Sequence, residues 1–416
     1  MKLYTYSKKS DDTDKMNHNF LKSLIEPADT KIFMLIMDGL GGLPKESGGK
    51  TELETAATPH LDALAEQSAL GLSSPAGAGI AVGSGPGHLA LFGFDPFEYE
   101  IGRGALEALG VDFDLEPNDV AARGNFCTVD ANGILTDRRA GRLPTEDSAK
   151  LCELLSTIQI EGVRFFVMPV KEHRFAFVIR GTDLGDYLSD TDPQKVGVAP
   201  DRVKALDEKS KETAKLVNEF IDKARLLLAD KSTANMIMLR GFASLPRMPQ
   251  FADIYGLKAA AIAVNGMYRG VSRLVGMEVL PVDGITIADE FTTLEKYWQD
   301  YDFFYLHIKK TDTYGESGDF DAKVKVIEEV DSFIPRVMAL NPDVVIVGGD
   351  HSSPAVLKSH SWHPVPTLLY SKFVRADGVR EFGERACGRG SLGVFSAQEI
   401  MPLALANAGR LAKYNA

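Results

Sequence analysis

The sequence predicts an α/β protein with a mostly parallel sheet that carries helices on both faces, and a smaller α/β domain inserted into it. Three observations favour this fold class. Short, continuous apolar runs, such as residues 31–37 and 344–347, are typical of strands buried on both faces. Helical stretches separate these runs, as crossover connections between parallel strands require. Between the two groups of runs, the chain changes to a hairpin-like pattern.

The bulk composition is that of an ordinary globular protein. Of the 416 residues, 44% are hydrophobic and 25% are charged, and the formal net charge is −12. This acidic balance argues against general nucleic-acid binding, which needs a basic face. No apolar run approaches the ~20 residues of a membrane helix, and the three scattered cysteines are typical of reduced thiols. We therefore expect a cytoplasmic protein with no nucleic-acid or membrane partner.

The first part of the chain contains an extension, a strand and a helix. Residues 1–30 are polar and mixed in charge and lack the apolar core of a signal peptide, so we expect an N-terminal extension outside the main fold. The buried strand at residues 31–37 follows and ends at Asp38. A threonine and a first-turn proline then predict a helix over residues 61–68.

A glycine-rich stretch over residues 79–93 has a single hydroxyl group at its centre. Glycines flank Ser84, Pro86 stands where the first turn of a helix would begin, and an apolar run follows. Ser84 is therefore expected to cap or just precede a helix, where unpaired backbone N–H groups and the helix dipole favour an anion. A hydroxyl group at this position can hold a phosphate or attack one. On its own, the stretch also fits a glycine-rich turn with a capping serine.

The middle of the chain is predicted to form a second domain, over residues 112–250. Residues 120–135 and 173–179 have the patterns of strands, and residues 203–228 those of a long charged helix. A further strand is expected at residues 234–239.

After this insertion the pattern of buried strands returns. The expected helix over residues 321–340 is the most prominent of those between the strands. The two ends of the chain are thus expected to build one discontinuous domain, from residues 31–111 and 251–416. The apolar runs of its second part are residues 257–264, 302–308, 344–347 and 367–370.

Acidic side chains lie just beyond the ends of three predicted strands. Asp38, Asp312 and Asp350 would therefore gather at the edge where open α/β sheets place their ligands. Carboxylate and imidazole groups together suit divalent Mn, Zn, Fe or Mg, so the sequence predicts a metal site at this edge. Three histidines follow the last acid within one short span: His351, His360 and His363.

Five motifs in a fixed order carry a family resemblance. They are Asp38-Gly39, Gly83-Ser84-Gly85-Pro86-Gly87-His88, Thr311-Asp312, Gly349-Asp350-His351-Ser352 and the stretch from His360 to Pro366. They resemble the motifs of the alkaline phosphatase superfamily and, more closely, those of the cofactor-independent (2,3-bisphosphoglycerate-independent) phosphoglycerate mutases of the archaeal type. The likeness runs from about residue 31 to the C-terminus and implies an alkaline-phosphatase-like fold.

The resemblance implies two divalent metal ions, with Mn²⁺ expected and Mg²⁺, Co²⁺ or Zn²⁺ as alternatives, and no 2,3-bisphosphoglycerate. The second ion would take Asp312 and His360, with Glu316 standing where the family has a histidine. Glu316 either ligates this ion or points to solvent. His363 stands where the family has a small polar or acidic residue. The first ion would be held by four side chains that match the family pattern: Asp38, Ser84, Asp350 and His351.

The resemblance also implies the reaction, which belongs to glycolysis and gluconeogenesis. Ser84 would attack the 3-phosphate of phosphoglycerate and form a phosphoserine. Glycerate would turn in the closed site, and its 2-hydroxyl group would take the phosphoryl group back. Bound cations lower the pKa of a hydroxyl group and neutralise charge on the attacking and leaving oxygens, so the chemistry is consistent with the metal site.

Arginines gather in the middle of this acidic chain, where we expect them to hold the substrate. Arginine forks match carboxylates and phosphates in bidentate geometry, although a solvated basic loop would have the same composition. Among the expected substrate contacts are positions that match substrate-binding residues of the family. The full set is Arg123, Asp137, Arg138, Arg139, Arg142, His173, Arg174, Arg240 and Lys258.

Two other functions fit the same residues. The first is another metal-dependent phosphoryl enzyme of the superfamily, either a phosphatase or a relative of homoserine kinase, which would differ in letting water reach the phosphoserine. The second is a non-catalytic metabolite-binding protein whose second metal site has decayed, as Glu316 would suggest. The sequence leaves the oligomeric state open.

Overall fold

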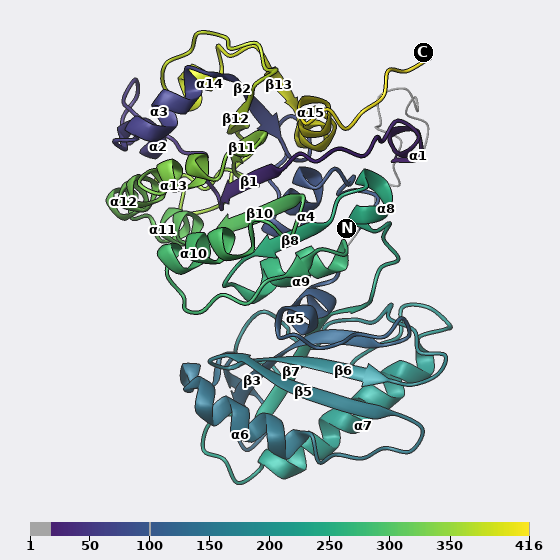
Figure 1. The fold of residues 1–416 in the computed structure, drawn as a ribbon. Coiled ribbons are helices and arrows are strands. Elements are labelled where there is room, and N and C mark those ends of the chain that lie inside the picture. Colours follow the sequence, from purple (N-terminus) through teal and green to yellow (C-terminus); the bar gives the residue numbers. More distant parts are fainter. Residues whose placement is uncertain (1–17, 100, 416) are drawn as a thin grey trace.

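The computed structural model describes residues 18–99 and 101–415 of the chain. These residues form two sheets with helices packed against them, one sheet above the other in Figure 1. The predicted N-terminal extension lies outside the described residues as far as residue 17. Its remaining part includes α1 (His18–Lys22), whose Leu21 is buried in the hydrophobic core, so this part belongs to the main fold.

The larger sheet has eight strands in the order β13-β2-β12-β11-β1-β10-β8-β9. β1 (Ile32–Met37) lies inside the sheet and is parallel to both of its neighbours, β10 (Phe303–Ile308) and β11 (Val344–Gly348). The carboxyl ends of these three strands therefore meet at one edge. β12 alone runs antiparallel to both of its neighbours. The other strands are β2 (Ser68–Ser74), β8 (Ala259–Ile262), β9 (Glu278–Val279), β12 (Val365–Ser371) and β13 (Gly393–Ser396).

Helices cover both faces of this sheet, which confirms the predicted fold class. Alternate residues of β1 enter two separate hydrophobic cores, with Met34 in one and Leu35 in the other. The core around Met34 also receives α4 (Ser84–Leu91), α5 (Arg103–Gly110), α8 (Phe251–Tyr255), α9 (Gly266–Leu274) and α15 (Ile400–Asn407). The core around Leu35 receives α2 (Glu52–Thr55), α3 (Pro59–Ala65), α10 (Ile287–Tyr297), α12 (Phe320–Asp331), α13 (Ile334–Ala339) and α14 (Glu384–Cys387).

The smaller sheet is antiparallel, with the strand order β4-β3-β6-β5 and with β7 paired to β3. Two helices, α6 (Thr145–Leu155) and α7 (Lys211–Leu228), share a hydrophobic core with it. The domain boundaries at residues 112 and 250 stay a prediction. The strands of this sheet are β3 (Val120–Val129), β4 (Leu135–Asp137), β5 (Arg164–Lys171), β6 (Arg174–Arg180) and β7 (Met236–Ser244).

Three of the predicted helices differ from the observed ones. The helix expected over residues 61–68 is α3 (Pro59–Ala65), and Ser68 already belongs to β2. The helix expected from residue 203 begins only at Lys211, because the side chain of Asn218 binds both the N–H and the C=O of Val203 and holds that residue beside the helix. The helix expected over residues 321–340 is divided into α12 and α13. Pro335 lies in the first turn of α13, where a proline is tolerated, whereas inside a continuous helix it would remove a hydrogen bond.

Helix α5 lies between the two sheets (Figure 1) and contacts β3 on one side and α9 on the other. At one point of each contact the two backbones touch directly. A Cβ atom added at Gly104 would lie 2.2 Å from the carbonyl oxygen of Ala121 in β3, and one added at Gly110 would lie 2.5 Å from that of Gly266 in α9. Only glycine fits at these two points. Among the described residues, no helix has the length and apolar character that crossing a membrane requires.

A carboxyl group with a strongly shifted pKa ties α14 to the first part of the chain. One oxygen of Glu384 accepts a hydrogen bond from the backbone N–H of Gly42 (2.9 Å), and the other accepts one from the hydroxyl group of Thr51 (2.5 Å). Burial raises the pKa of the Glu384 carboxyl group to about 7, although both hydrogen bonds work against this shift.

This shift predicts a stability that falls as the pH rises. The unfolded chain releases the proton of Glu384 near the ordinary pKa of about 4.3, whereas the folded chain keeps it until the pH reaches about 7. The folded state therefore loses stability across this interval, by roughly 3 kcal/mol. Glu384→Gln resembles the protonated form at every pH, so this variant should lack the fall in stability that the ionisation of Glu384 causes. Urea unfolding at pH 5 and pH 8 measures the change in the free energy of unfolding. Glu381→Gln, at an exposed position, serves as the control. Equal pH dependence in wild type and Glu384→Gln would contradict the prediction.

Candidate active site

The acids predicted from the strand ends gather at the carboxyl edge of the larger sheet. Asp38 follows β1, Asp350 follows β11, and Asp312 lies in α11 (Lys310–Ser317), which follows β10. All three are buried. The arrangement arises because the three strands are parallel neighbours, so that their ends lie side by side.

Asp38, Asp350 and His351 form the first group of potential metal ligands. Each offers a ligand atom within 4.8 Å of the others. Nε2 of His351 lies 3.3 Å from Oδ1 of Asp38 and 3.3 Å from Oδ2 of Asp350. Both of these carboxylate oxygens are buried and accept no hydrogen bond from any described residue. Two such oxygens that converge on one place suit a cation.

Ser84 lies beside this group. It is the first residue of α4, with Gly83 as the N-cap, so the structure places its hydroxyl group in the first helical turn. Its Oγ lies 3.0 Å from Nε2 of His351. Burial lowers the pKa of His351, but the negative charges around it, Asp350 foremost, outweigh burial and raise it to about 9.

Several neighbours of these acids were not assigned from the sequence. Nδ1 of His88 lies 3.2 Å from Oδ2 of Asp350, and Tyr268 donates a short hydrogen bond to Asp38. Nζ of Lys309 lies 2.8 Å from Oδ2 of Asp38 and 2.6 Å from Oδ2 of Asp312, and so joins both acids. The place of Lys309 directly after β10 was the sequence signal for it.

These neighbours keep Asp38 ionised. Burial raises the pKa of its carboxyl group, but the imidazole rings of His307 and His351, 3.4 and 3.3 Å from its oxygens, and the charge of Lys309 hold the pKa well below its usual range. The pKa of His307, in contrast, is lowered to about 4 by burial. His307 is thus neutral near pH 7, and its ring stacks on Tyr268 with 3.5 Å between the ring centroids.

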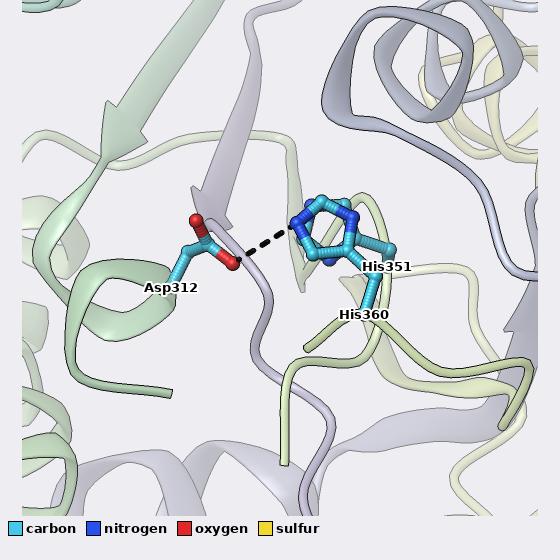
Figure 2. A group of neighbouring side chains, drawn as sticks. All are labelled: Asp312, His351 and His360. Carbon is cyan, nitrogen blue, oxygen red and sulfur yellow. Dashed lines mark ion pairs between the residues drawn. The ribbon is translucent and has the colours of Figure 1, made fainter. Parts of the chain in front are cut away.

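Asp312, His351 and His360 form the second group (Figure 2). Oδ1 of Asp312 lies 3.5 Å from Nε2 of His360, and the rings of His351 and His360 stack with 3.7 Å between their centroids. His351 therefore belongs to both groups, which the sequence did not indicate. Ser353 supports the second group, since its hydroxyl group donates to Oδ1 of Asp312 at 2.5 Å and lies 3.2 Å from Nδ1 of His351.

Glu316 reaches the edge of this second group. Its Oε1 lies 3.5 Å from Nε2 of His360, but 55% of the side chain is exposed, and Glu316 is not among the three residues whose ligand atoms converge. Ligation of a metal ion by Glu316 therefore stays a prediction.

His363 lies beyond the ligand groups. Its Nδ1 lies 3.0 Å from the hydroxyl group of Ser361, and its ring stacks on Trp362 with 5.1 Å between the centroids. The side chain of Trp362 is itself exposed. His363 thus occupies the loop that carries His360 without joining the group of His360.

Most of the predicted substrate-binding residues line one cavity of about 320 Å³ in the smaller sheet and its loops. Asp137 does not line it but shapes its wall, since its carboxylate accepts hydrogen bonds from the backbone N–H groups of Arg139 and Gly141. Asp192, which was not predicted, holds Arg138 in a bidentate pair at 3.0 and 2.7 Å. The lining residues are Arg123, Asn125, Arg138, Arg139, Arg142, Glu172, His173, Arg174 and Arg240.

Lys258 does not belong with these residues. It directly precedes β8, so it lies at the amino edge of the larger sheet, opposite the edge that carries Asp38. Its ammonium group lies 4.6 Å from the ring centroid of Tyr301, which precedes β10 at the same edge. The expectation that Lys258 contacts substrate is therefore withdrawn.

Comparisons with known proteins point to one family. Residues 65–234 match the family described as 2,3-bisphosphoglycerate-independent phosphoglycerate mutase. The probable 2,3-bisphosphoglycerate-independent phosphoglycerate mutase of Thermosipho africanus is 53% identical over 398 residues, which cover 95% of this chain and 98% of the relative. A protein of the same description from Thermus thermophilus is 52% identical over 402 residues, with the same coverage.

Two solved structures share the fold. The PH0037 protein from Pyrococcus horikoshii superposes with a TM-score of 0.81 at 30% identity, over 93% of this chain and 99% of the other. The cofactor-independent phosphoglycerate mutase from Thermoplasma acidophilum superposes with a TM-score of 0.72 at 28% identity, over 91% of this chain and 100% of the other.

Proposed function

Since the chain belongs to the 2,3-bisphosphoglycerate-independent phosphoglycerate mutases, which are isomerases, we propose that Ser84 carries the phosphoryl group between two positions of phosphoglycerate. The main support is the place of its hydroxyl group, in the first turn of α4 and 3.0 Å from Nε2 of His351. Backbone N–H groups at a helix N-terminus favour a phosphate, so this position suits both the free and the phosphorylated serine.

The residues present fit two divalent metal ions. Buried carboxylate oxygens without hydrogen bonds, set beside imidazole nitrogens, are donors of the kind that such ions take. Asp38, Ser84, Asp350 and His351 would hold one ion. Asp312 and His360 would hold the other ion, and Glu316 would be its third ligand. When bound, the ions supply positive charge that lowers the pKa of a hydroxyl group and neutralises phosphoryl oxygens.

The covalent steps are a transfer to Ser84 and a transfer back. The hydroxyl group of Ser84 loses its proton, its Oγ forms a bond to phosphorus, and the bond from phosphorus to the 3-oxygen of the substrate breaks. The 3-oxygen takes up one proton, so this transfer leaves the proton count unchanged. After glycerate has turned, its 2-hydroxyl group loses a proton and attacks the phosphoserine, and Oγ of Ser84 leaves and takes up a proton. No atoms are gained or lost overall, as an isomerisation requires.

The arginine-lined cavity would hold the carboxylate and hydroxyl groups of glycerate during the turn. Arg138 is fixed by its bidentate pair with Asp192, whereas Arg139 and Arg142 make no side-chain hydrogen bond or ion pair within the described residues. Burial lowers the pKa of His173, and the arginines around it lower it further, so His173 is neutral near pH 7. We infer that the inserted domain, residues 112–250, closes on the substrate and keeps water from the phosphoserine. A cytoplasmic location, as for other steps of glycolysis, is part of this proposal.

Ser84→Ala should abolish mutase activity and leave the fold intact, because it removes the nucleophile but no packing contact. Activity is measured with 3-phosphoglycerate and Mn²⁺ in an enolase-coupled assay without 2,3-bisphosphoglycerate. Mass spectrometry of wild-type enzyme quenched with substrate should find phosphate on Ser84, and the exposed Ser332→Ala serves as the control. Residual activity above about a thousandth of wild type would contradict the assignment of Ser84.

Replacement of Arg139 and Arg142 together by alanine should raise KM, because two groups that bind the glycerate carboxylate would be lost. The release of inorganic phosphate should also increase relative to isomerisation, because glycerate would leave before the second transfer. Steady-state kinetics with phosphate detection measures both quantities. Arg202→Ala, which breaks an exposed ion pair with Asp222, is the matched control. Wild-type values for both quantities would mean that the two arginines do not bind substrate.

Replacement of Glu316 tests its role as a ligand. If it ligates the second ion, Glu316→Ala should weaken activation by metal ions. Glu316→His should keep activity and shift the preference from Mn²⁺ or Mg²⁺ toward Co²⁺ or Zn²⁺, since imidazole is a softer donor than carboxylate. Activity is titrated with each of the four ions. The same metal dependence in wild type and both variants would show that Glu316 is not a ligand.

A further inference from the structure

Two loops carry the first group of ligands, and they lie directly against each other. We call residues 38–43 and 350–355 the ligand loops. The backbone N–H of Gly39 donates to Oδ1 of Asp350 at 3.0 Å. In the opposite direction, the N–H of Ser353 lies 3.2 Å from the carbonyl oxygen of Gly39 and 3.0 Å from that of Gly41. The distance between the ligands in the first group therefore depends on how these two loops are held.

A buried lysine joins the carbonyl groups of both loops. Lys323 lies on α12 with 0% of its surface exposed. Its Nζ donates to the carbonyl oxygens of Gly39 (2.8 Å), Gly41 (3.2 Å) and Ser353 (2.9 Å). All three protons of the ammonium group are thus used, each on the backbone of a ligand loop.

A buried glutamate joins the N–H groups of the same loops. Glu52, on α2, is also 0% exposed. One of its oxygens accepts from the backbone N–H of Leu43 at 3.1 Å, and the other accepts from that of Ala355 at 2.7 Å. Lys323 and Glu52 therefore bind the two loops through backbone groups of opposite polarity.

We propose that Lys323 and Glu52 form a brace that sets the spacing of the metal ligands in both groups. They are positioning residues, because neither contacts a ligand side chain, and the proposal rests on the metal-ligand assignments of the proposed function. The brace reaches the second group through Ser353, whose carbonyl oxygen binds Lys323 and whose hydroxyl group binds Asp312. Partners of this kind, which orient metal ligands without touching the metal, typically change metal affinity about 10- to 100-fold when replaced.

The charge of Lys323 gives this proposal an unusual test. Burial lowers the pKa of Lys323, while the negative charges of Glu52, Glu384, Asp312 and Asp38 raise it. An ammonium group in this position repels a nearby metal ion, so electrostatics alone predicts that its removal would strengthen metal binding. The brace predicts the opposite, since the loops would lose three hydrogen bonds that hold the ligands in place.

The experiment compares Lys323→Met with Lys325→Met. Lys325 lies on the same helix but is exposed. Each protein is freed of metal with a chelator and titrated with Mn²⁺, and binding is measured by calorimetry or from the electron paramagnetic resonance signal of free Mn²⁺. The brace predicts that Lys323→Met binds Mn²⁺ about 10- to 100-fold more weakly than wild type, while Lys325→Met binds as wild type does. Equal or tighter binding by a folded Lys323→Met would overturn it.

A second variant decides the matter if Lys323→Met does not fold. Glu52→Gln keeps the shape of the side chain but turns an amide N–H₂ group toward one of the two backbone N–H groups, so one hydrogen bond is lost. It should also weaken Mn²⁺ binding, whereas the exposed Glu46→Gln should not. Unchanged affinity in Glu52→Gln would overturn the brace. Failure of wild type to bind Mn²⁺ would instead overturn the metal assignments on which the proposed function rests.

Discussion

The burial of three carboxylates at one sheet edge is the constraint on which the rest of the structure depends. Asp38, Asp312 and Asp350 are all shielded from water, and ionised carboxylates in such a place destabilise the fold unless cations face them. Lys309 and His351 supply part of the opposing charge. The carboxylate oxygens that remain without hydrogen bonds show that this compensation is incomplete within the described residues. A site that favours added positive charge is therefore a property of the sheet edge itself.

The two sheets meet through one short helix. The glycines of α5 bring its backbone against β3 on one side and α9 on the other, and its apolar side chains, such as Leu106 and Leu109, pack in the core beside these contacts. The site thus combines ligand loops that are tied to two buried helical side chains with a smaller sheet that packs against α5.

Much of the fold and of the site could be predicted because the signals are local. Apolar runs that end in an acid placed Asp38 and Asp350 correctly at the sheet edge. Other features depend on tertiary contacts. Helix α7 begins later than predicted because Asn218 contacts Val203, and no local sequence pattern predicts this contact. Lys258 was assigned because it matches a position of the family, and such a match does not reveal the edge of the sheet at which a residue lies.

The burial of Lys323 did have a sequence signal. Lys323 stands three, four and seven residues before Val326, Ile327 and Val330, all buried on the same helix. A lysine at such a spacing is easily taken for a solvated one, and only its three carbonyl partners explain its burial.

The stacking of Trp362 on His363 has a practical consequence. The chain has only two tryptophans. Trp298 is 3% exposed in the core of the larger sheet, whereas Trp362 is 55% exposed in the loop between His360 and His363. An indole in a dry core emits light at shorter wavelengths than one in contact with water, so the two emissions are separable in the native spectrum. The protein therefore carries its own optical probe two residues from a candidate metal ligand, together with an internal reference in the core. Movements of that loop can be followed in the unmodified chain, without a label that would disturb the site.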